Sequence, residues 1–165
     1  MSHIRPSLVK GLFADSVFNQ IKEYVNWIAA QVEYSPLQDL VFKRHHVNDD
    51  PALVGVHENL AGWLSDYLKI QVKKSYCFLS IYRDGGICPL HTDRPQCEYT
   101  IDVCISQREP WTIYVDGRPF DMQENDAVIY SGTQSPHYRN RIHEGNHCFL
   151  VFFHFVPIDF VGSLQ

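Results

Sequence analysis

Hydrophobic positions in the first seventy residues recur at the spacing of amphipathic helices. One such pattern covers residues 15–34 and ends before Pro36, which cannot continue a helix. A second pattern covers residues 51–68, where Asp50 can cap the amino terminus and Pro51 fits the first turn. The sequence therefore predicts two helices, each with one face buried against the rest of the protein.

After Lys74 the hydrophobic period changes to two, which is typical of half-buried strands. Runs rich in aromatic and β-branched residues are separated by turn signals such as Asp84-Gly85-Gly86 and Asp116-Gly117. These runs predict strands at residues 76–83, 99–106, 112–115, 127–130, 136–141 and 147–156. Because no helical pattern lies between them, we expect the strands to pair antiparallel.

Two helices followed by a run of strands predict an α+β, mainly β protein, in which a β-sandwich or jelly roll is buttressed by the N-terminal helices. A length of 165 residues suits a single domain over residues 1–165. We expect helical support over about residues 8–70 and the jelly-roll core over about residues 75–156. The polar stretch 43–50 is expected to be a mobile loop.

The charge balance argues against one class of partner. Lysine and arginine number 14 against 19 aspartates and glutamates, which gives a net charge of -5. This is the wrong sign for a generic binder of phosphate backbones, so no nucleic-acid partner is expected. The most apolar stretch, residues 148–161, is interrupted by His154, Pro157 and Asp159, so no membrane span is expected. Without a basic and then apolar leader, the expected localisation is cytoplasmic.

The five cysteines are odd in number and include no C-x-x-C pair. This pattern argues against a disulfide framework and against a structural zinc knuckle, so reduced thiols are expected. A chain of this length buries enough surface to fold without a metal. Any metal site would therefore serve chemistry, and the nine histidines are the residues in which to look for it.

Candidate metal ligands lie in the strand region. His91 and Asp93 are two residues apart, so on an extended segment their side chains project from the same side of the backbone. His137, from a neighbouring strand, would complete two imidazoles and one carboxylate on one face of an octahedron. Such a set leaves three positions open and is typical of non-haem Fe(II) oxygenases. The sequence thus predicts a metal site formed by these three residues.

Two further segments accompany these ligands. Residues 81–86 (Ile-Tyr-Arg-Asp-Gly-Gly) form a strand and turn before the first pair, and residues 125–130 (Asn-Asp-Ala-Val-Ile-Tyr) form a strand that leads to the loop before His137. With them, residues 75–156 resemble the prolyl-4-hydroxylase-like branch of the Fe(II)- and 2-oxoglutarate-dependent oxygenases. The resemblance implies a double-stranded β-helix (jelly roll) and oxidative decarboxylation of 2-oxoglutarate coupled to hydroxylation. It also implies Fe(II) bound by His91, Asp93 and His137.

The chain departs from this pattern at the anchor for the distal carboxylate of 2-oxoglutarate. Tyr82, nine residues before the first metal ligand, resembles the tyrosine that contacts this carboxylate, but His147 stands where the family usually has Arg or Lys. An imidazole donates one hydrogen bond, whereas a guanidinium offers a bidentate fork. Arg139 and Arg141 share the face of His137 if the strand is regular. We expect Arg139 to be the anchor, with His147 as a helper that a bound carboxylate holds protonated.

The sequence therefore predicts a non-haem Fe(II)- and 2-oxoglutarate-dependent dioxygenase that hydroxylates a peptide residue, an amino acid or a small metabolite. Loops 43–50 and 94–98 are expected to face that substrate. Two alternatives stay open: a cupin-like metalloenzyme that does not use 2-oxoglutarate, and a non-catalytic jelly-roll binding module. We interpret His45, His46 and His154 as structural residues.

Overall fold

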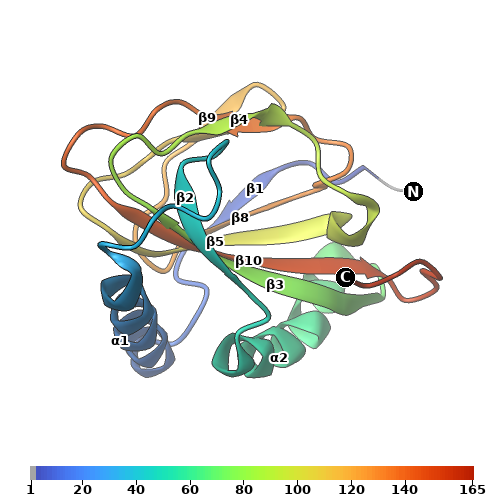
Figure 1. Cartoon of the computed structure of the whole chain (residues 1–165). Coiled ribbons are helices and arrows are strands. Elements are labelled where there is room, and N and C mark those ends of the chain that lie inside the picture. Colours follow the sequence, from blue (N-terminus) through green and yellow to red (C-terminus); the bar gives the residue numbers. More distant parts are fainter. Residues whose placement is uncertain (1–2) are drawn as a thin grey trace.

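A computed structural model describes residues 3–165 (Figure 1). Its helices are α1 (Asp15–Val32) and α2 (Pro51–Leu68), both where the hydrophobic pattern predicts them. Its strands are β1 (Ser7–Val9), β2 (Arg44–Asn48), β3 (Val72–Tyr82), β4 (Cys88–His91), β5 (Tyr99–Gln107), β6 (Ile113–Val115), β7 (Arg118–Phe120), β8 (Ala127–Tyr130), β9 (His137–Arg139) and β10 (Cys148–Pro157). One short 3-10 turn, η1 (Pro95–Cys97), precedes β5.

The strands form two antiparallel sheets. The larger sheet has the order β1-β8-β5-β10-β3-β2, and the smaller sheet has the order β4-β9-β6-β7. Both helices lie on the outer side of the larger sheet, and the smaller sheet lies on its other side (Figure 1). The predicted α+β jelly roll buttressed by N-terminal helices is therefore confirmed as a double-stranded β-helix.

Alternation along the central strands supplies two separate cores. In β5, Ile101 and Val103 face the helices and belong to the core between helices and sheet. The intervening Asp102 and Cys104 are completely buried, and Cys104 packs in the second core, between the two sheets. This central strand, buried on both faces, thus places the polar side chain of Asp102 inside the jelly roll. Apolar packing alone does not explain a carboxylate at this position.

The structure corrects the prediction for residues 43–50. This segment contains β2, an ordered strand that pairs antiparallel with β3 and sets Arg44 opposite Tyr82. The histidines of β2 also contact the protein: His45 is buried, and the His46 ring stacks on Phe78 with ring centroids 5.0 Å apart. The short strands β1, β4 and β7 were also absent from the sequence prediction.

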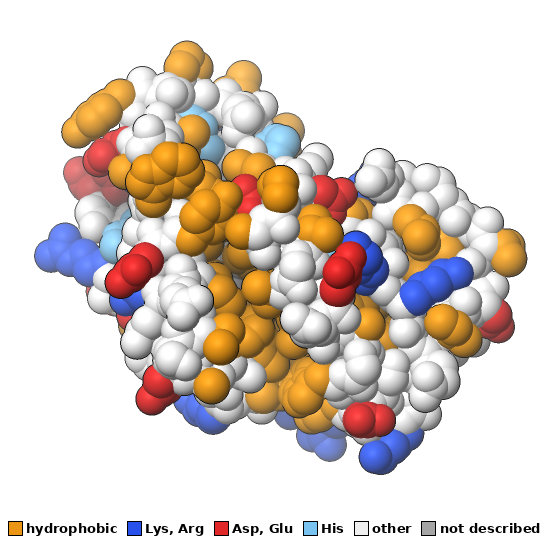
Figure 2. All heavy atoms as spheres, turned by 90° about the horizontal axis from the view of Figure 1, so that it is seen from below, with side chains coloured by type: hydrophobic (Ala, Val, Ile, Leu, Met, Phe, Trp, Pro, Cys, Tyr) orange, Lys and Arg blue, Asp and Glu red, His pale blue; other side chains and the backbone are white. Residues whose placement is uncertain are grey.

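The face that carries the helices is shown in Figure 2, where a band of hydrophobic side chains runs through its middle. Several aromatic side chains on the helices are exposed, including Trp27 on α1 and Tyr67 on α2. None of the helices in residues 3–165 is long and apolar enough to cross a membrane. All five cysteines are buried as free thiols, in agreement with the expectation from their number and spacing.

Asp50 caps α2 and links it to α1. Its Oδ1 accepts hydrogen bonds from the backbone nitrogens of Ala52, at 3.0 Å, and Leu53, and its Oδ2 accepts one from the Tyr24 hydroxyl at 2.8 Å. We expect Asp50→Ala to lower the free energy of unfolding by about 1–2 kcal/mol, because the amino terminus of the helix loses its cap. Urea denaturation would measure this loss. Asp50→Asn keeps the capping oxygen, so an equal loss in that variant would contradict the capping role.

Candidate active site

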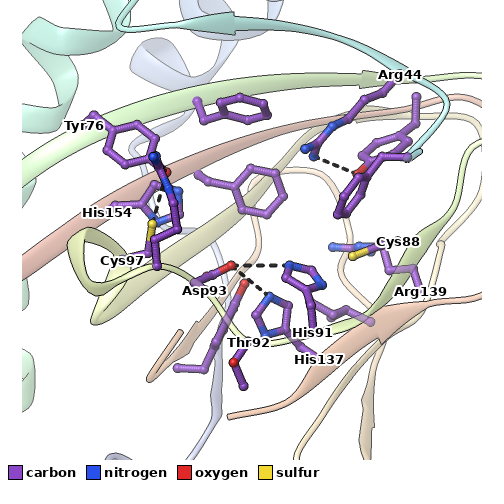
Figure 3. Close-up of a pocket in the computed structure, with 17 residues that line it drawn as sticks. Arg44, Tyr76, Cys88, His91, Thr92, Asp93, Cys97, His137, Arg139 and His154 are labelled. Carbon is purple, nitrogen blue, oxygen red and sulfur yellow. Dashed lines mark hydrogen bonds and ion pairs between the residues drawn. The ribbon is translucent and has the colours of Figure 1, made fainter. Parts of the chain in front are cut away.

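A cavity of about 310 Å³ lies between the two sheets. Its volume falls at the lower end of the range for small-molecule sites. Aromatic side chains form much of its wall, and three arginines (Arg44, Arg94 and Arg139) also line it. Figure 3 shows that His91, Asp93 and His137 point toward one another at this cavity, with Tyr76, Cys97 and His154 on one side of them and Arg44, Cys88 and Arg139 on the other.

Strand pairing brings the two candidate imidazole ligands together. His91 ends β4 and His137 begins β9, and the antiparallel ladder makes them direct partners. Their ring centroids are 4.4 Å apart. The Oδ1 atom of Asp93 lies 3.4 Å from Nε2 of His91 and 3.5 Å from Nε2 of His137. The structure thus brings all three predicted ligands to one point, although they come from two different strands and a loop.

Backbone carbonyl groups fix the orientation of both imidazoles. Nδ1 of His91 lies 2.6 Å from the carbonyl oxygen of Pro89, and Nδ1 of His137 lies 2.8 Å from that of Ser135. A carbonyl oxygen can only accept, so each Nδ1 carries the hydrogen and donates it. Each Nε2 is therefore the atom directed at the shared point. Metal-binding histidines in proteins are commonly held by such a second hydrogen bond.

The position of the Asp93 carboxylate depends on Gly132. The backbone nitrogen of Asp93 donates to the carbonyl oxygen of Gly132 at 2.8 Å, which ties the ligand loop to the segment after β8. A Cβ atom at position 132 would lie only 2.5 Å from Oδ2 of Asp93. No side chain fits between the two segments, so this position needs glycine for the carboxylate to stay where it is.

The electrostatics of the three residues suit a cation. Burial opposes ionisation of Asp93, but hydrogen bonds from His137 and His91 outweigh it and hold the pKa of this carboxyl below its usual range. Burial also lowers the pKa of His91, but the hydrogen bond to Asp93 raises it to about 10. A metal ion that binds here must displace this proton from His91. Two imidazole nitrogens and one carboxylate form a donor set that fits Fe(II) and related divalent ions.

Arg139 lines the cavity, but its guanidinium is already paired. Nη2 donates to Oδ2 of Asp102 at 2.7 Å, and Nη1 donates to the carbonyl oxygen of Trp111. Both members of the pair are buried, at 2% and 0% exposure of their side chains. Burial lowers the pKa of Arg139, but the Asp102 carboxylate more than compensates, so the net shift is upward and the guanidinium stays charged.

Arg44 is a cavity residue that the sequence analysis did not single out. Its Nη1 donates to the hydroxyl of Tyr82 at 3.0 Å and to Oγ of Ser80 at 3.1 Å, and its Nε pairs with Asp39 at 3.0 Å. The guanidinium also lies over the ring of Phe42, 4.2 Å from its centroid. Tyr82, which the sequence analysis predicted as a site residue, therefore lines the cavity, and its hydroxyl group accepts a hydrogen bond from the Arg44 guanidinium.

His147 does not reach this cavity, which differs from its predicted place beside the co-substrate. Its Nε2 lies 3.1 Å from Oγ of Ser106, and its ring packs against Phe149. The reason is alternation: Cys148, the next residue, is buried in the core between the sheets, so His147 projects from the opposite face of the strand. Arg141 is exposed and lines a different, smaller cavity.

A cluster of polar and aromatic side chains lines the other side of the cavity. The sequence analysis placed only loop 94–98 of this cluster near the substrate. Nη2 of Arg94 donates to the hydroxyl of Tyr76 at 2.8 Å, and this hydroxyl lies 3.1 Å from Sγ of Cys97. His154, interpreted above as a structural residue, also lines the cavity. Its Nδ1 lies 3.0 Å from Oγ1 of Thr100, and burial lowers its pKa to about 4.

No protein-family model matches the chain, and no curated protein matches it significantly. Solved structures do match. A prolyl-4-hydroxylase from Pseudomonas putida is 12% identical, with a TM-score of 0.70 over 90% of this chain and 91% of that one. HygX from Streptomyces hygroscopicus, with nickel and 2-oxoglutarate bound, is 13% identical, with a TM-score of 0.67 over 94% and 84%.

A third structure is SnoN, a non-haem α-ketoglutarate-dependent epimerase of nogalamycin biosynthesis. It is 7% identical, with a TM-score of 0.71 over 92% of this chain and 77% of that one. The fold implied by the resemblance in the sequence is therefore confirmed: the chain has the double-stranded β-helix of the Fe(II)- and 2-oxoglutarate-dependent oxygenases. Hydroxylases and an epimerase share this fold, so the fold does not by itself fix the reaction outcome.

The contribution of the buried Arg139–Asp102 ion pair to stability can be tested directly. Asp102→Ala leaves the Arg139 guanidinium buried without its counterion, and we expect the free energy of unfolding to fall by about 3–5 kcal/mol. Urea denaturation of the metal-free protein would measure it. The double variant Asp102→Leu/Arg139→Met removes both charges and should regain most of the loss. A loss below about 1 kcal/mol in the single variant, the range of exposed pairs, would contradict a buried charge pair.

Proposed function

We propose that this chain is a non-haem Fe(II)- and 2-oxoglutarate-dependent oxygenase that hydroxylates a small molecule. The observation that carries the proposal is the convergence of two Nε2 atoms and one carboxylate at the wall of the cavity between the sheets. The fold agrees with it, since HygX, which has the same fold, binds nickel and 2-oxoglutarate.

In this proposal, His91, Asp93 and His137 hold Fe(II). When bound, the iron, 2-oxoglutarate and dioxygen would supply the oxidising chemistry: one oxygen atom of dioxygen would enter the substrate as a hydroxyl group, and the other would enter succinate as 2-oxoglutarate loses CO2. The protein contributes the geometry. The two backbone carbonyls keep each Nε2 directed at the metal position, and Gly132 leaves room for the Asp93 carboxylate. The phenylalanine and tyrosine rings on the cavity wall give the reacting groups apolar neighbours.

We further propose that the distal carboxylate of 2-oxoglutarate binds between Tyr82 and Arg44. The Tyr82 hydroxyl and the Arg44 guanidinium are adjacent, and a carboxylate there would accept hydrogen bonds from both. Arg139 lies on the same side of the metal ligands, but both of its Nη atoms already donate, to Asp102 and to the carbonyl oxygen of Trp111, and its side chain is only 2% exposed. Arg44 therefore takes the role that the sequence analysis assigned to Arg139 with help from His147.

Removal of the carboxylate ligand tests the metal site. Asp93→Ala is expected to lose iron during gel filtration after anaerobic loading, because two imidazoles alone hold Fe(II) weakly. The thermal midpoint of the metal-free variant should stay within a few degrees of wild type, since the two cores do not involve this residue. Asp66→Ala, an exposed aspartate on α2, is the matched control and should retain iron. Full iron retention by Asp93→Ala would contradict the assigned ligand set.

A second test concerns 2-oxoglutarate itself. Arg44→Gln removes a charge-assisted hydrogen bond, and we expect the affinity for 2-oxoglutarate to fall about ten- to a hundred-fold. His147→Ala should leave the affinity unchanged, because His147 lies outside the cavity. Anaerobic calorimetric titration of the iron-loaded proteins would measure both. If wild type binds no 2-oxoglutarate at millimolar concentration, the co-substrate is wrong and the cupin-like alternative is favoured.

A further inference from the structure

The three cavity arginines differ in one respect. Arg44 pairs with Asp39 and Arg139 pairs with Asp102, at 3.0 and 2.7 Å. Among the described residues, no carboxylate lies within ion-pair distance of Arg94. No carboxylate therefore offsets the positive charge of Arg94, whereas Arg44 and Arg139 each have one carboxylate partner. Arg94 lines the same cavity as the three proposed metal ligands.

The Arg94 guanidinium is also held in place. Tyr76 accepts a hydrogen bond from its Nη2 at 2.8 Å, and the guanidinium lies over the Tyr76 ring, 5.2 Å from its centroid. Tyr76 is fixed in turn by Sγ of Cys97 at 3.1 Å and by the ring of His154. A guanidinium that is positioned before the ligand arrives loses less conformational entropy on binding.

The cavity wall next to this pair is aromatic. The Phe152 ring stacks on His154, 6.2 Å between centroids, and His154 packs against Tyr76. Phe78, 6.4 Å from Phe152, continues this wall toward Arg44, whose guanidinium lies 4.7 Å from the Phe78 centroid. In Figure 3, Tyr76 lies on the side of the metal ligands opposite Arg44 and Arg139, at the other end of this wall from the place assigned above to 2-oxoglutarate. The combination of one free cation and aromatic faces suits a ligand with one anionic group and an apolar body.

We propose that Arg94 binds the carboxylate of the substrate, and that the substrate is a small monocarboxylic acid whose apolar body lies against Phe78 and Phe152. This inference rests on the proposed function, because it assigns a substrate class to the same cavity. Arg94 binds the carboxylate through its guanidinium fork, and Tyr76 is the residue that positions the guanidinium.

Calorimetry with a matched pair of probes tests the proposal. The acid 3-phenylpropionate and its uncharged amide share one apolar body, and each is titrated into the full-length chain without metal and again with Fe(II) and 2-oxoglutarate under anaerobic conditions. Wild type should bind the acid more tightly than the amide. Arg94→Gln should weaken the acid about ten- to a hundred-fold and leave the amide unchanged. Arg94→Lys should retain part of the affinity, because it keeps the charge but loses the fork.

Arg118→Gln is the matched control. Arg118 is exposed and lies over an aromatic ring as Arg94 does, 5.7 Å from the Phe120 centroid, but it is outside the cavity. Equal affinities for acid and amide, no binding of the acid to wild type, or an equal loss in Arg118→Gln would each overturn the inference. Failure of the proposed function has a different signature, since 2-oxoglutarate would then bind neither wild type nor Arg94→Gln, whatever the acid does.

Discussion

The register between β4 and β9 is the constraint on which the candidate site depends. Cys88 pairs with Arg139 and His91 pairs with His137, so β4 carries one residue more than β9 between these two partners. In a regular strand, residues three apart face opposite sides, and the extra residue of this bulge lets both Cys88 and His91 face the cavity. Without it, the strand that supplies the first imidazole would turn either that ligand or the neighbouring wall residue away from the cavity.

The two cores separate stability from chemistry. The core between helices and larger sheet is mostly apolar, with the buried His57 of α2 packed against Phe153 and Phe155, and it buries the outer faces of β3, β5 and β10. These strands are thereby held rigid while their inner faces carry polar groups, among them Asp102 on β5 and His154 on β10. The buried ion pair of Asp102 with Arg139 lies on this inner side. The two charges neutralise each other there and are not paired with a ligand.

Much of the fold could be predicted from the sequence, because it follows from local periodicity. The convergence of His91, Asp93 and His137 could also be predicted, from the H-x-D spacing together with the resemblance to the oxygenases. The helix over Pro51–Leu68 begins with the residues that the cap and the proline indicate, and the spacing of His91 and Asp93 gives their common side. The edge strand β2 could not be predicted, since it is stabilised by pairing with β3 and by ring stacking rather than by alternating hydrophobic residues. The ion pair of Arg139 with Asp102 could not be predicted either, because the two residues lie 37 positions apart in the sequence. Spacing also gave no warning that His147 faces away from the cavity, since its orientation follows from the burial of Cys148 beside it.

The position of β2 has a consequence for how the cavity wall can be altered. β2 is one of the two edge strands of the larger sheet and, among the strands of the described residues, pairs with β3 alone. It supplies Arg44 to the wall of the cavity, whereas Val47, further along the strand, packs against the core between helices and sheet. A substitution at Arg44 therefore reshapes the cavity from the margin of the sheet, without replacing a core residue or any of the three side chains that converge at the candidate metal site.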